Sequence, residues 1–314
     1  MPSIGYEVVT TFSETRDIKR IVMKPTAPVP IAWSAGAHIR VTLTDGSSRA
    51  YSLLRLPGLP AGHIAFGVLR ERESKGGSKF MHALKPGDKV QLSHPVNHFE
   101  LGNHAEPSVL IAGGIGITPI LSMAAELARS GRAFEVHYAG RAEGMLAFVP
   151  EIQEICGPRL SLHYDDQPSA MNVGKILRDA PDGAHVYFCG PAGMIAAIRA
   201  TASELGWPGE RVHYELFSAD VAASENTAFD VEIHGTGQIV HVPADMTIIE
   251  ALEEAGLDPL YDCQRGDCGI CQCTVIEGVP DHRDVILTDA EKAENNVMQI
   301  CVSRSKTAKL VIEI

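Results

Sequence analysis

The sequence predicts a multidomain protein with an antiparallel β domain, an α/β domain and a smaller cysteine-rich domain, in that order. Three observations support this prediction. The 314 residues exceed the usual size of one domain, which is about 150 residues. Near residue 105 the pattern changes from strands separated by tight turns to short strands that alternate with helices. Five of the seven cysteines lie after residue 262.

The composition and charge of the chain exclude several classes of protein. Hydrophobic residues make up 45% and charged residues 21% of the sequence, which excludes a long disordered, collagenous or coiled-coil chain. The net charge of −12 argues against nucleic-acid binding, because such proteins are basic. Residues 225–314 hold 17 of the 39 acidic residues and only 6 of the 27 basic ones. This asymmetry predicts steering toward a basic partner, with plain solubility as the alternative.

We expect a cytoplasmic protein without a membrane span. Met1–Thr11 lacks the basic start and apolar core of a secretory signal. The uncharged run Ser108–Ala125 approaches the length of a membrane span. However, its three glycines and one proline are better explained by a strand, a loop and a helix.

The first domain, residues 1–104, is predicted to be antiparallel because its apolar, β-branched segments are separated by turn signals. Its clearest strands are His38–Leu43, Ile64–Arg70 and Lys89–Leu92, and its turns are Asp45-Gly46, Pro57-Gly58 and Lys85–Asp88.

The second domain, residues 105–217, alternates short strands with helices, which implies a parallel sheet. The predicted strands are Val109–Ala112, Ala133–Tyr138, Leu160–His163 and His185–Cys189, and the predicted helices are Ile120–Arg129 and Ile195–Leu205.

Residues 218–228 are small and polar, so they are predicted to be a linker. The third domain, residues 229–314, begins with two strands, Phe229–Ile233 and Gln238–Val242. A helix follows over Thr247–Ala255, where Thr247 and Glu250 have the spacing of a capping box.

The cysteines of the third domain carry the most specific signal in the chain. Cys263, Cys268 and Cys271 read C-x4-C-x2-C, and Cys301 follows after 29 intervening residues. This is the spacing of a plant-type [2Fe–2S] cluster, which needs four thiolates on two irons. A structural zinc site is the alternative, although zinc usually takes paired short spacings. Cys273 is interpreted as a bystander.

Three further segments suit phosphates and flat rings. Gly113–Pro119 lies between a predicted strand and a predicted helix, where glycines allow close backbone approach and a helix start favours pyrophosphate. It differs from the G-x-G-x-x-G pattern. Lys75–Lys79 places Gly-Gly-Ser before a probable helix. Arg49–Leu53 offers an Arg fork for a phosphate, with an aromatic ring and a hydroxyl beside it.

With these motifs, the whole chain resembles the phthalate dioxygenase reductase family. Its R-x-Y-S, G-G-x-G-x-T-P and C-G-P segments are similar to those of ferredoxin-reductase-like proteins, and the third domain looks like a plant-type ferredoxin. The order of domains separates this family from relatives that carry the ferredoxin first. The resemblance implies an antiparallel β-barrel flavin domain at 1–104, a parallel-sheet α/β NAD-binding domain at 105–217 and an α+β (β-grasp) ferredoxin domain at 229–314.

The resemblance also implies which residues contact the flavin. The R-x-Y-S motif supplies the phosphate contact and a hydroxyl near the reactive ring nitrogen, a barrel strand supplies backbone contacts, and the Gly-Gly-Ser turn binds phosphate. An aromatic residue at the end of the second domain packs on the ring. These residues are Arg49, Tyr51, Ser52, Val68, Leu69, Arg70, Gly76, Gly77, Ser78 and Phe217. The family binds FMN, and FAD is the alternative.

For the nicotinamide cofactor, the resemblance implies a glycine loop and a strand end that meet at the site. The residues are Gly113, Gly114, Gly116, Thr118, Cys189, Gly190 and Pro191. Thr118 and Cys189 would lie near the nicotinamide ring, so these two residues and Ser52 are the candidate catalytic residues. NADH is expected because the family uses it. NADPH is the alternative, since Arg141 could meet a 2′-phosphate, although Asp165-Asp166 would oppose one.

The implied function is an NADH-dependent oxidoreductase. It would pass single electrons from NADH through the flavin and the [2Fe–2S] cluster to a terminal Rieske-type oxygenase, for aromatic ring hydroxylation or O-demethylation. The oxygenase would dock on the acidic C-terminal domain. A reductase for a cytochrome P450 or another iron oxygenase is the alternative within this class. A non-enzymatic electron carrier or metal-binding scaffold is the alternative from another class.

The thirteen histidines are scattered along the chain and form no helical H-x-x-x-H pair. His94 and His98 are four residues apart, but Pro95 between them breaks a helix. We therefore interpret the histidines as structural.

Overall fold

The structure is a computed structural model that describes residues 3–27, 31–71, 74, 76–217, 226–262, 264, 266 and 269–314. The chain divides into two compact units, residues 1–215 and 216–314. Each unit is described by itself. Most of the predicted linker, residues 218–225, lies outside the described residues.

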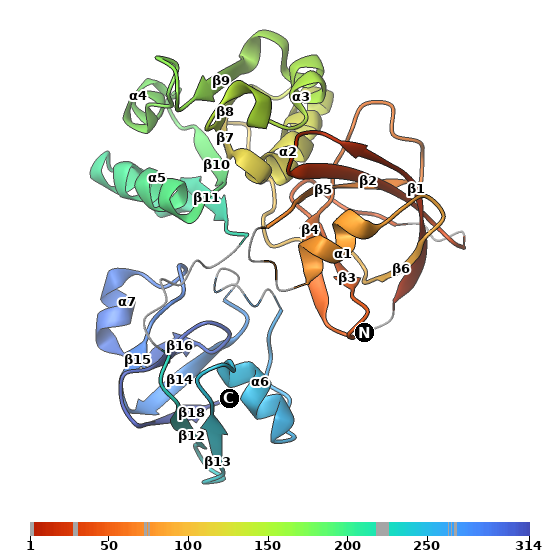
Figure 1. The fold of residues 1–314 in the computed structure, drawn as a ribbon. Helices are drawn as coiled ribbons and strands as arrows, with labels where there is room; N and C mark the ends of the chain where they lie inside the picture. The colour runs from red at the N-terminus through yellow and green to blue at the C-terminus, as the bar shows by residue number, and fades with distance from the viewer. Residues whose placement is uncertain are drawn as a thin grey trace. The chain divides into compact units, whose positions relative to one another are not determined.

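The N-terminal part of the first unit is an antiparallel six-stranded sheet in the order β4-β3-β6-β1-β2-β5. Figure 1 shows these strands in red and orange, with one short helix beside them. The elements are β1 (Ile4–Ser13), β2 (Ile18–Pro25), β3 (His38–Thr42), β4 (Ser48–Ser52), β5 (Ile64–Leu69), α1 (Gly77–Ala83) and β6 (Lys89–Leu92).

This sheet closes on itself between its two end strands. The Leu54 N–H, just after β4, donates to the Ala65 carbonyl of β5 at 3.0 Å. The enclosed core contains Tyr6, Ile39 and Phe66, none of which is exposed to solvent. Burial of these alternating apolar side chains provides the main driving force for closing the barrel.

The rest of the first unit is a five-stranded parallel sheet in the order β11-β10-β7-β8-β9. Its central strand β7 is buried along its whole length, because helices cover both faces of such a sheet. The strands are β7 (Ser108–Gly113), β8 (Phe134–Gly140), β9 (Leu160–Tyr164), β10 (His185–Cys189) and β11 (Val212–Glu215). The α-helices are α2 (Ile117–Ser130), α3 (Val149–Cys156), α4 (Val173–Asp179) and α5 (Ala192–Glu204), and the 3-10 turns are η1 (Gly114–Gly116), η2 (Glu143–Met145), η3 (Gly157–Arg159) and η4 (Gly209–Arg211).

The strand order reverses beside β7, whose neighbours β8 and β10 lead away in opposite directions. Ligands of open α/β sheets bind at the carboxyl ends of the strands at such a switch point. Helix α2 begins three residues earlier than predicted, at Ile117. Pro119 is compatible with this start because the first turn of a helix needs no N–H bond from it.

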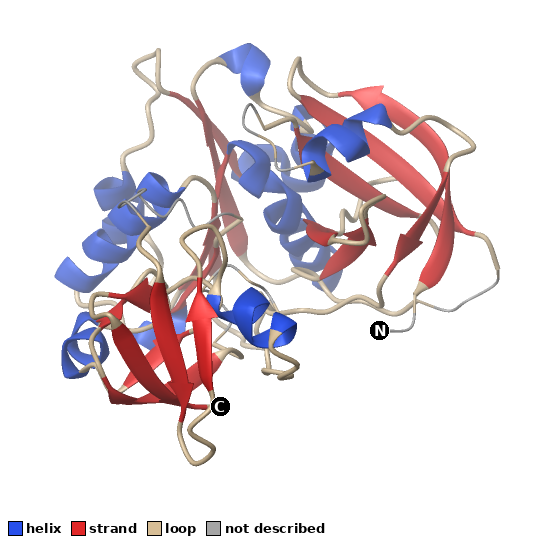
Figure 2. Ribbon diagram, turned by 60° about the horizontal axis from the view of Figure 1, so that its bottom comes forward, coloured by secondary structure: helices blue, strands red, loops and turns tan. Residues whose placement is uncertain are grey.

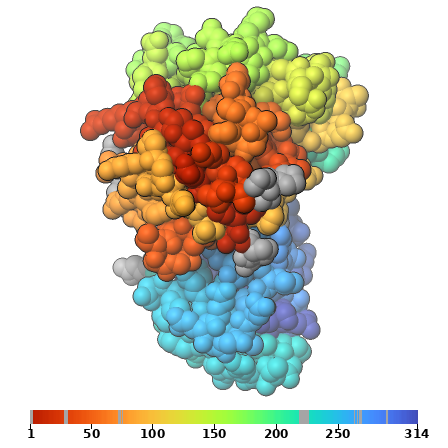
Figure 3. All heavy atoms as spheres, turned by 90° about the vertical axis from the view of Figure 1, so that its right-hand side faces the viewer, coloured from red at the N-terminus to blue at the C-terminus, as the bar shows by residue number. Residues whose placement is uncertain are grey.

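The barrel and the α/β sheet pack against each other within one unit. In the space-filling view the barrel, in red and orange, and the α/β residues, in yellow and green, meet without a break (Figure 3). The Ser122 hydroxyl of α2 donates to the Leu53 carbonyl at 2.7 Å and accepts from the Arg55 N–H at 3.0 Å. These bonds attach α2 to the segment that leaves β4.

The second unit is a mixed five-stranded sheet in the order β13-β12-β18-β14-β16, with helix α6 beside it (Figure 2). Only the β12–β18 pair is parallel among its described strands. The predicted capping box of α6 is confirmed, since Thr247 and Glu250 each bond the other's backbone N–H. The elements are β12 (Phe229–Ile233), β13 (Ile239–Val242), α6 (Ile248–Glu254), β14 (Gln272–Glu277), β15 (Pro280–Asp281), α7 (Asp289–Glu294), β16 (Val297–Gln299), β17 (Arg304–Ser305) and β18 (Lys309–Glu313).

The multidomain fold class predicted from the sequence is therefore confirmed: an antiparallel barrel, a parallel α/β sheet and a ferredoxin-like α+β unit. Across the described residues, the helices are too short or too polar to cross a bilayer.

Candidate functional site

The first part of the site is a cradle formed by β4 and the start of α1. A Cβ placed on Gly77 would lie 2.6 Å from the Arg49 Cγ and 3.2 Å from the Tyr51 hydroxyl oxygen. Gly76 has a φ of +105°, a conformation that favours glycine. Burial raises the pKa of Tyr51, so its phenol stays protonated as a donor. The cradle presents an arginine, a phenol and glycine backbone side by side, which fits an anionic, ring-bearing cofactor such as a flavin.

Two serines that were predicted to contact the flavin lie beside this cradle. Ser52 ends β4 and is buried, and Ser78 is buried in the first turn of α1. The Ser78 hydroxyl accepts from the Glu71 N–H at 3.2 Å.

Two of the backbone groups at the end of β5 that were predicted to contact the flavin already bond other residues of the protein. The Val68 carbonyl pairs with the His82 ring at 2.8 Å, and the Arg70 N–H donates to the Asp17 carbonyl at 2.7 Å. Burial lowers the pKa of His82, which favours the neutral imidazole. The contacts of Val68, Leu69 and Arg70 with a flavin stay predictions.

The second part of the site lies at the carboxyl ends of β7 and β10. These strands pair in parallel, with Ala112 opposite Cys189. A Cβ on Gly113 would lie 2.7 Å from the Met194 Sδ and 2.8 Å from the Pro191 Cδ. The two predicted segments, 113–116 and 189–191, are thus brought into direct contact. Their glycine backbones form a floor over which a pyrophosphate fits.

Thr118 links the loop of residues 113–116, here called the nucleotide loop, to the barrel. Its side chain is buried, and its hydroxyl donates to the Ile115 carbonyl at 3.0 Å. A Cβ on Gly67 of β5 would lie 2.8 Å from the Thr118 methyl carbon. The nucleotide loop and the predicted flavin strand therefore touch, as a reaction between two bound cofactors requires.

The third part of the site is in the second unit. Cys271 and Cys301 are both buried, and the Ile300 N–H donates to the Cys271 carbonyl at 3.2 Å. The Cys271 thiol also contacts the Gln299 Oε1 at 3.5 Å. The sheet thus draws together two cysteines that are 30 positions apart, as the cluster requires. Cys263 and Cys268 lie outside the described residues.

Cys273 lies in the same core, opposite Met298 in the sheet. Burial raises the pKa of its thiol to about 12, so the thiol holds its proton at neutral pH. Its interpretation as a bystander stays a prediction.

Phe217 is half-buried and belongs to the second unit. Its predicted contact with the flavin ring stays a prediction.

Sequence reasoning missed a group of residues that join the barrel to the nucleotide loop. They are Glu14, Arg20, Tyr138, Phe148 and Glu151. The sequence carried no motif for them, because they come from five separate elements or loops.

The histidines include an unexpected stack. His104, Glu106 and His185 bring possible ligand atoms within 4.8 Å of one another. However, the two imidazoles lie face to face, with centroids 3.7 Å apart and planes 13° apart. Their lone pairs are then parallel and cannot converge on one ion. His185 also bonds His213 at 3.0 Å, so the stack supports the structural interpretation of these histidines.

Comparison with known proteins agrees with this geometry. Residues 231–306 match the family of 2Fe-2S iron-sulfur cluster binding domains, and residues 110–200 match the oxidoreductase NAD-binding domain. These ranges cover the cysteine loop and the glycine loop.

Relatives cover nearly the whole chain. A vanillate O-demethylase oxidoreductase from Pseudomonas sp. (strain HR199 / DSM 7063) is 44% identical over 287 residues, which are 89% of this chain and 90% of the relative. A phenoxybenzoate dioxygenase subunit beta from Ectopseudomonas oleovorans is 39% identical and covers 90% of this chain and 88% of its own.

Solved structures match this chain over nearly its whole length. Phthalate dioxygenase reductase, described as a modular structure for electron transfer from pyridine nucleotides to [2Fe–2S], matches 99% of this chain and 98% of its own, with a TM-score of 0.78 and 32% identity. Part of a type IV self-sufficient cytochrome P450 monooxygenase matches 99% of this chain and 41% of its own, with a TM-score of 0.75 and 35% identity.

The fold and the sites thus define an oxidoreductase with an NAD-binding domain and a 2Fe-2S ferredoxin domain. More particularly, the chain belongs to the phthalate dioxygenase reductase family. The family and the class of enzyme predicted from the sequence are confirmed.

Proposed function

We propose that this protein passes electrons from NADH, through a bound FMN and a [2Fe–2S] cluster, to a terminal Rieske-type oxygenase in the cytoplasm. The observation that carries the proposal is the contact between the nucleotide loop and β5 at Thr118 and Gly67. When bound, the flavin would accept a hydride and the cluster would carry single electrons. The proposed domains are the flavin domain at 1–104, the NAD-binding domain at 105–217 and the ferredoxin domain at 229–314, with a linker at 218–228.

The proposed cofactor residues are those predicted from the sequence. Arg49 would pair with the flavin phosphate, beside the backbone of Gly76 and Gly77. The glycine loop would hold the pyrophosphate of NADH, with Thr118 and Cys189 bordering the nicotinamide. Cys263, Cys268, Cys271 and Cys301 would bind the cluster.

The choice of NADH over NADPH is supported by the ends of β8 and β9. The Asp165 N–H donates to the Gly140 carbonyl at 3.0 Å. This bond brings Asp165 and Asp166 beside the segment that carries Arg141. Two carboxylates there would repel a 2′-phosphate, whereas a ribose hydroxyl would tolerate them.

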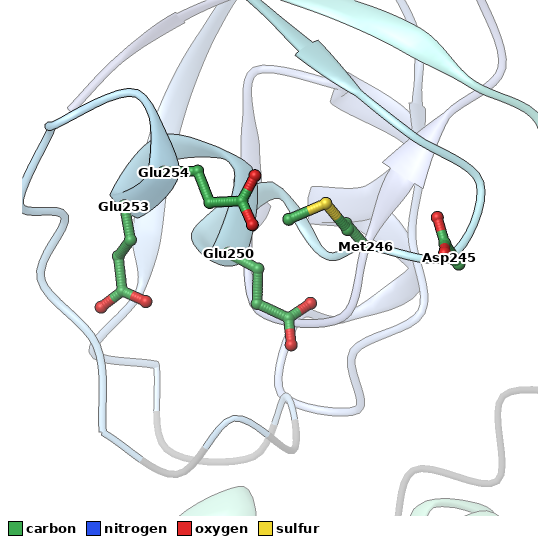
Figure 4. A pocket seen from close by; sticks show the side chains of 5 residues that line it. All are labelled: Asp245, Met246, Glu250, Glu253 and Glu254. Atoms are coloured by element: carbon green, nitrogen blue, oxygen red, sulfur yellow. The ribbon is translucent and has the colours of Figure 1, made fainter. Parts of the chain in front are cut away.

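The proposed docking surface for the oxygenase surrounds α6. A hollow there is lined by four acidic residues and one methionine, Asp245, Met246, Glu250, Glu253 and Glu254 (Figure 4). The Glu253 carboxylate accepts from the Tyr261 hydroxyl at 2.6 Å, which connects α6 to the residues just before Cys263. Acidic groups joined to the cluster loop would steer a basic partner toward the point of electron exit.

Relatives support a Rieske-type partner through their names, which include a vanillate O-demethylase oxidoreductase and a phenoxybenzoate dioxygenase subunit. The second candidate is a cytochrome P450, favoured by the match to part of a self-sufficient P450 monooxygenase.

The first test is a visible absorption spectrum of the purified protein, before and after anaerobic addition of NADH. We expect flavin and cluster bands that both bleach, FMN in the released fraction, and slower reduction by NADPH. A protein without flavin would contradict the proposed path, and released FAD would contradict the choice of FMN.

The partner is tested by electron delivery to a Rieske oxygenase and to a P450 at low and high salt. Glu254→Lys should slow delivery, whereas Glu294→Lys on α7 makes the same charge change elsewhere and should not. Equal effects of the two variants would contradict docking at α6, and faster delivery to the P450 would favour the second candidate.

A further inference from the structure

Tyr138 ties the nucleotide loop to the segment before α3. It lies on β8 and is fully buried. Its hydroxyl donates to the Gly114 carbonyl at 3.1 Å and accepts from the Ala147 N–H at 3.1 Å. Gly114 has a φ of +52°, and its carbonyl also accepts from the Ile117 N–H within the loop, so the Tyr138 hydroxyl is a second partner that comes from outside the loop. The Tyr138 hydroxyl therefore helps to fix the orientation of the Gly114 peptide in the nucleotide loop.

The next residue, Phe148, reaches the barrel. Its φ of +58° is in the left-handed region, which costs a phenylalanine free energy and persists only where the surroundings determine it. Its N–H donates to the Glu14 carboxylate at 3.3 Å. Its buried ring is so close to β5 that a Cβ on Gly67 would lie 2.7 Å from it. The barrel thus contacts the strained residue on two sides, at its N–H and at its ring.

Arg20 completes the connection. Its Nε donates to Glu14 at 2.5 Å, and its guanidinium also pairs with Glu151 of α3. The guanidinium lies 5.2 Å from the centre of the Phe148 ring. The Glu14 side chain is only 6% exposed, so solvent screens this pair weakly. One arginine on β2 therefore connects the turn after β1 to helix α3.

We propose that these five residues form an interdomain brace, Arg20–Glu14–Phe148–Tyr138–Gly114, which positions the nucleotide loop against the flavin strand β5. Tyr138 and Glu14 are its positioning residues. The inference rests on the proposed function, because it assumes that the loop binds NADH and the barrel binds the flavin. Its physical basis is that hydride transfer needs near-contact geometry, and a displacement of about 1 Å can cost roughly a hundredfold in rate.

The test uses the full-length, cofactor-loaded protein and the variant Tyr138→Phe, which removes one hydroxyl and leaves the Gly114 carbonyl and Ala147 N–H without it. We expect the limiting rate of flavin reduction by NADH to fall about tenfold. Amide hydrogen exchange over residues 113–118 should accelerate by a similar factor, a readout that does not depend on turnover.

Tyr187→Phe is the matched control. Tyr187 is equally buried on β10, which β7 separates from β8 in the same sheet, and its hydroxyl bonds the Gly102 N–H at 3.0 Å and His104 at 3.1 Å, outside the brace. If both variants change the rate and the exchange equally, the brace is only structural and the proposal is wrong.

Glu14 gives a second test that does not disturb the sheet. Glu14→Ala should slow flavin reduction more than it weakens NADH binding, because Glu14 contacts Phe148 and not the nucleotide loop. Glu14→Gln keeps an acceptor for the Phe148 N–H and should restore most of the rate. No difference between Glu14→Ala and wild type would overturn the proposal. If wild-type protein holds no flavin, the proposed function fails, while the exchange measurement still decides whether Tyr138 orders the loop.

Discussion

Gly116 passes so close to Cys189 that a Cβ on Gly116 would lie 2.1 Å from the Cys189 carbonyl oxygen. No side chain fits between these two backbones. The contact joins the loop after β7 to the end of β10, so two segments far apart in sequence form one floor for the nucleotide. Its consequences can be measured.

Gly116→Ala should weaken NADH binding. The added methyl would displace backbone rather than a flexible side chain, at a cost of about 1–3 kcal/mol, which corresponds to roughly tenfold or more in affinity. The measurement is the Kd for NADH by fluorescence. Gly193→Ala in α5 is the control, because nothing lies within 4 Å of its added Cβ. Unchanged affinity in Gly116→Ala would contradict the assignment of this loop.

Gly77→Ala should release the flavin. Its Cβ would collide with the Arg49 Cγ at 2.6 Å, and moving the Arg49 side chain would remove the proposed phosphate contact. We expect an affinity loss of roughly tenfold or more, measured as flavin content after dialysis. Gly144→Ala meets open space and should keep the flavin. Full retention by Gly77→Ala would place the flavin elsewhere.

The variants Cys301→Ser and Cys273→Ser test which of the two cysteines is a ligand of the cluster. Both cysteines are buried in the same core, so both variants test packing, but only Cys301 is in the four-cysteine set. Cys301→Ser should reduce iron and sulfide to roughly a tenth or less, because the cluster needs four ligands. Cys273→Ser should keep both, and should leave the visible spectrum intact. Iron loss in Cys273→Ser alone would reverse the two roles.

Acid should destabilise the first unit through His213. Burial, with help from His185 and His104, lowers its pKa to about 4 from an ordinary value of 6.5. Because the folded value is the lower one, the unfolded chain binds the proton first as pH falls. The contribution to stability is therefore complete above pH 6.5 and is lost toward pH 4, up to about 3 kcal/mol.

The variant His213→Phe keeps a ring that can stack on Tyr187, which lies 4.4 Å away, but it cannot take a proton. Urea unfolding between pH 7.5 and 5 should therefore be less pH-dependent in the variant than in the wild type. Parallel pH profiles would show that His213 does not contribute this dependence.

The sequence by itself determined the three-part fold, the cysteine spacing and the glycine segments. These signals are local. The apolar pattern of a strand repeats every two residues, the two residues of a capping box are three positions apart, and the three cysteines of the loop lie within nine positions. The boundaries were less accurate where context mattered, as at the start of α2.

Only the tertiary structure decided which distant groups meet. Glu14 and the Phe148 N–H are 134 residues apart, and no spacing rule connects them. Likewise, Tyr138 reads in the sequence as an ordinary core residue of a strand. Its hydroxyl gains a role because the sheet places it under the Gly114 carbonyl, where a buried polar group must find a partner. Local chemistry is written in short motifs, whereas the positioning of one domain on another arises from packing between elements that folding brings together.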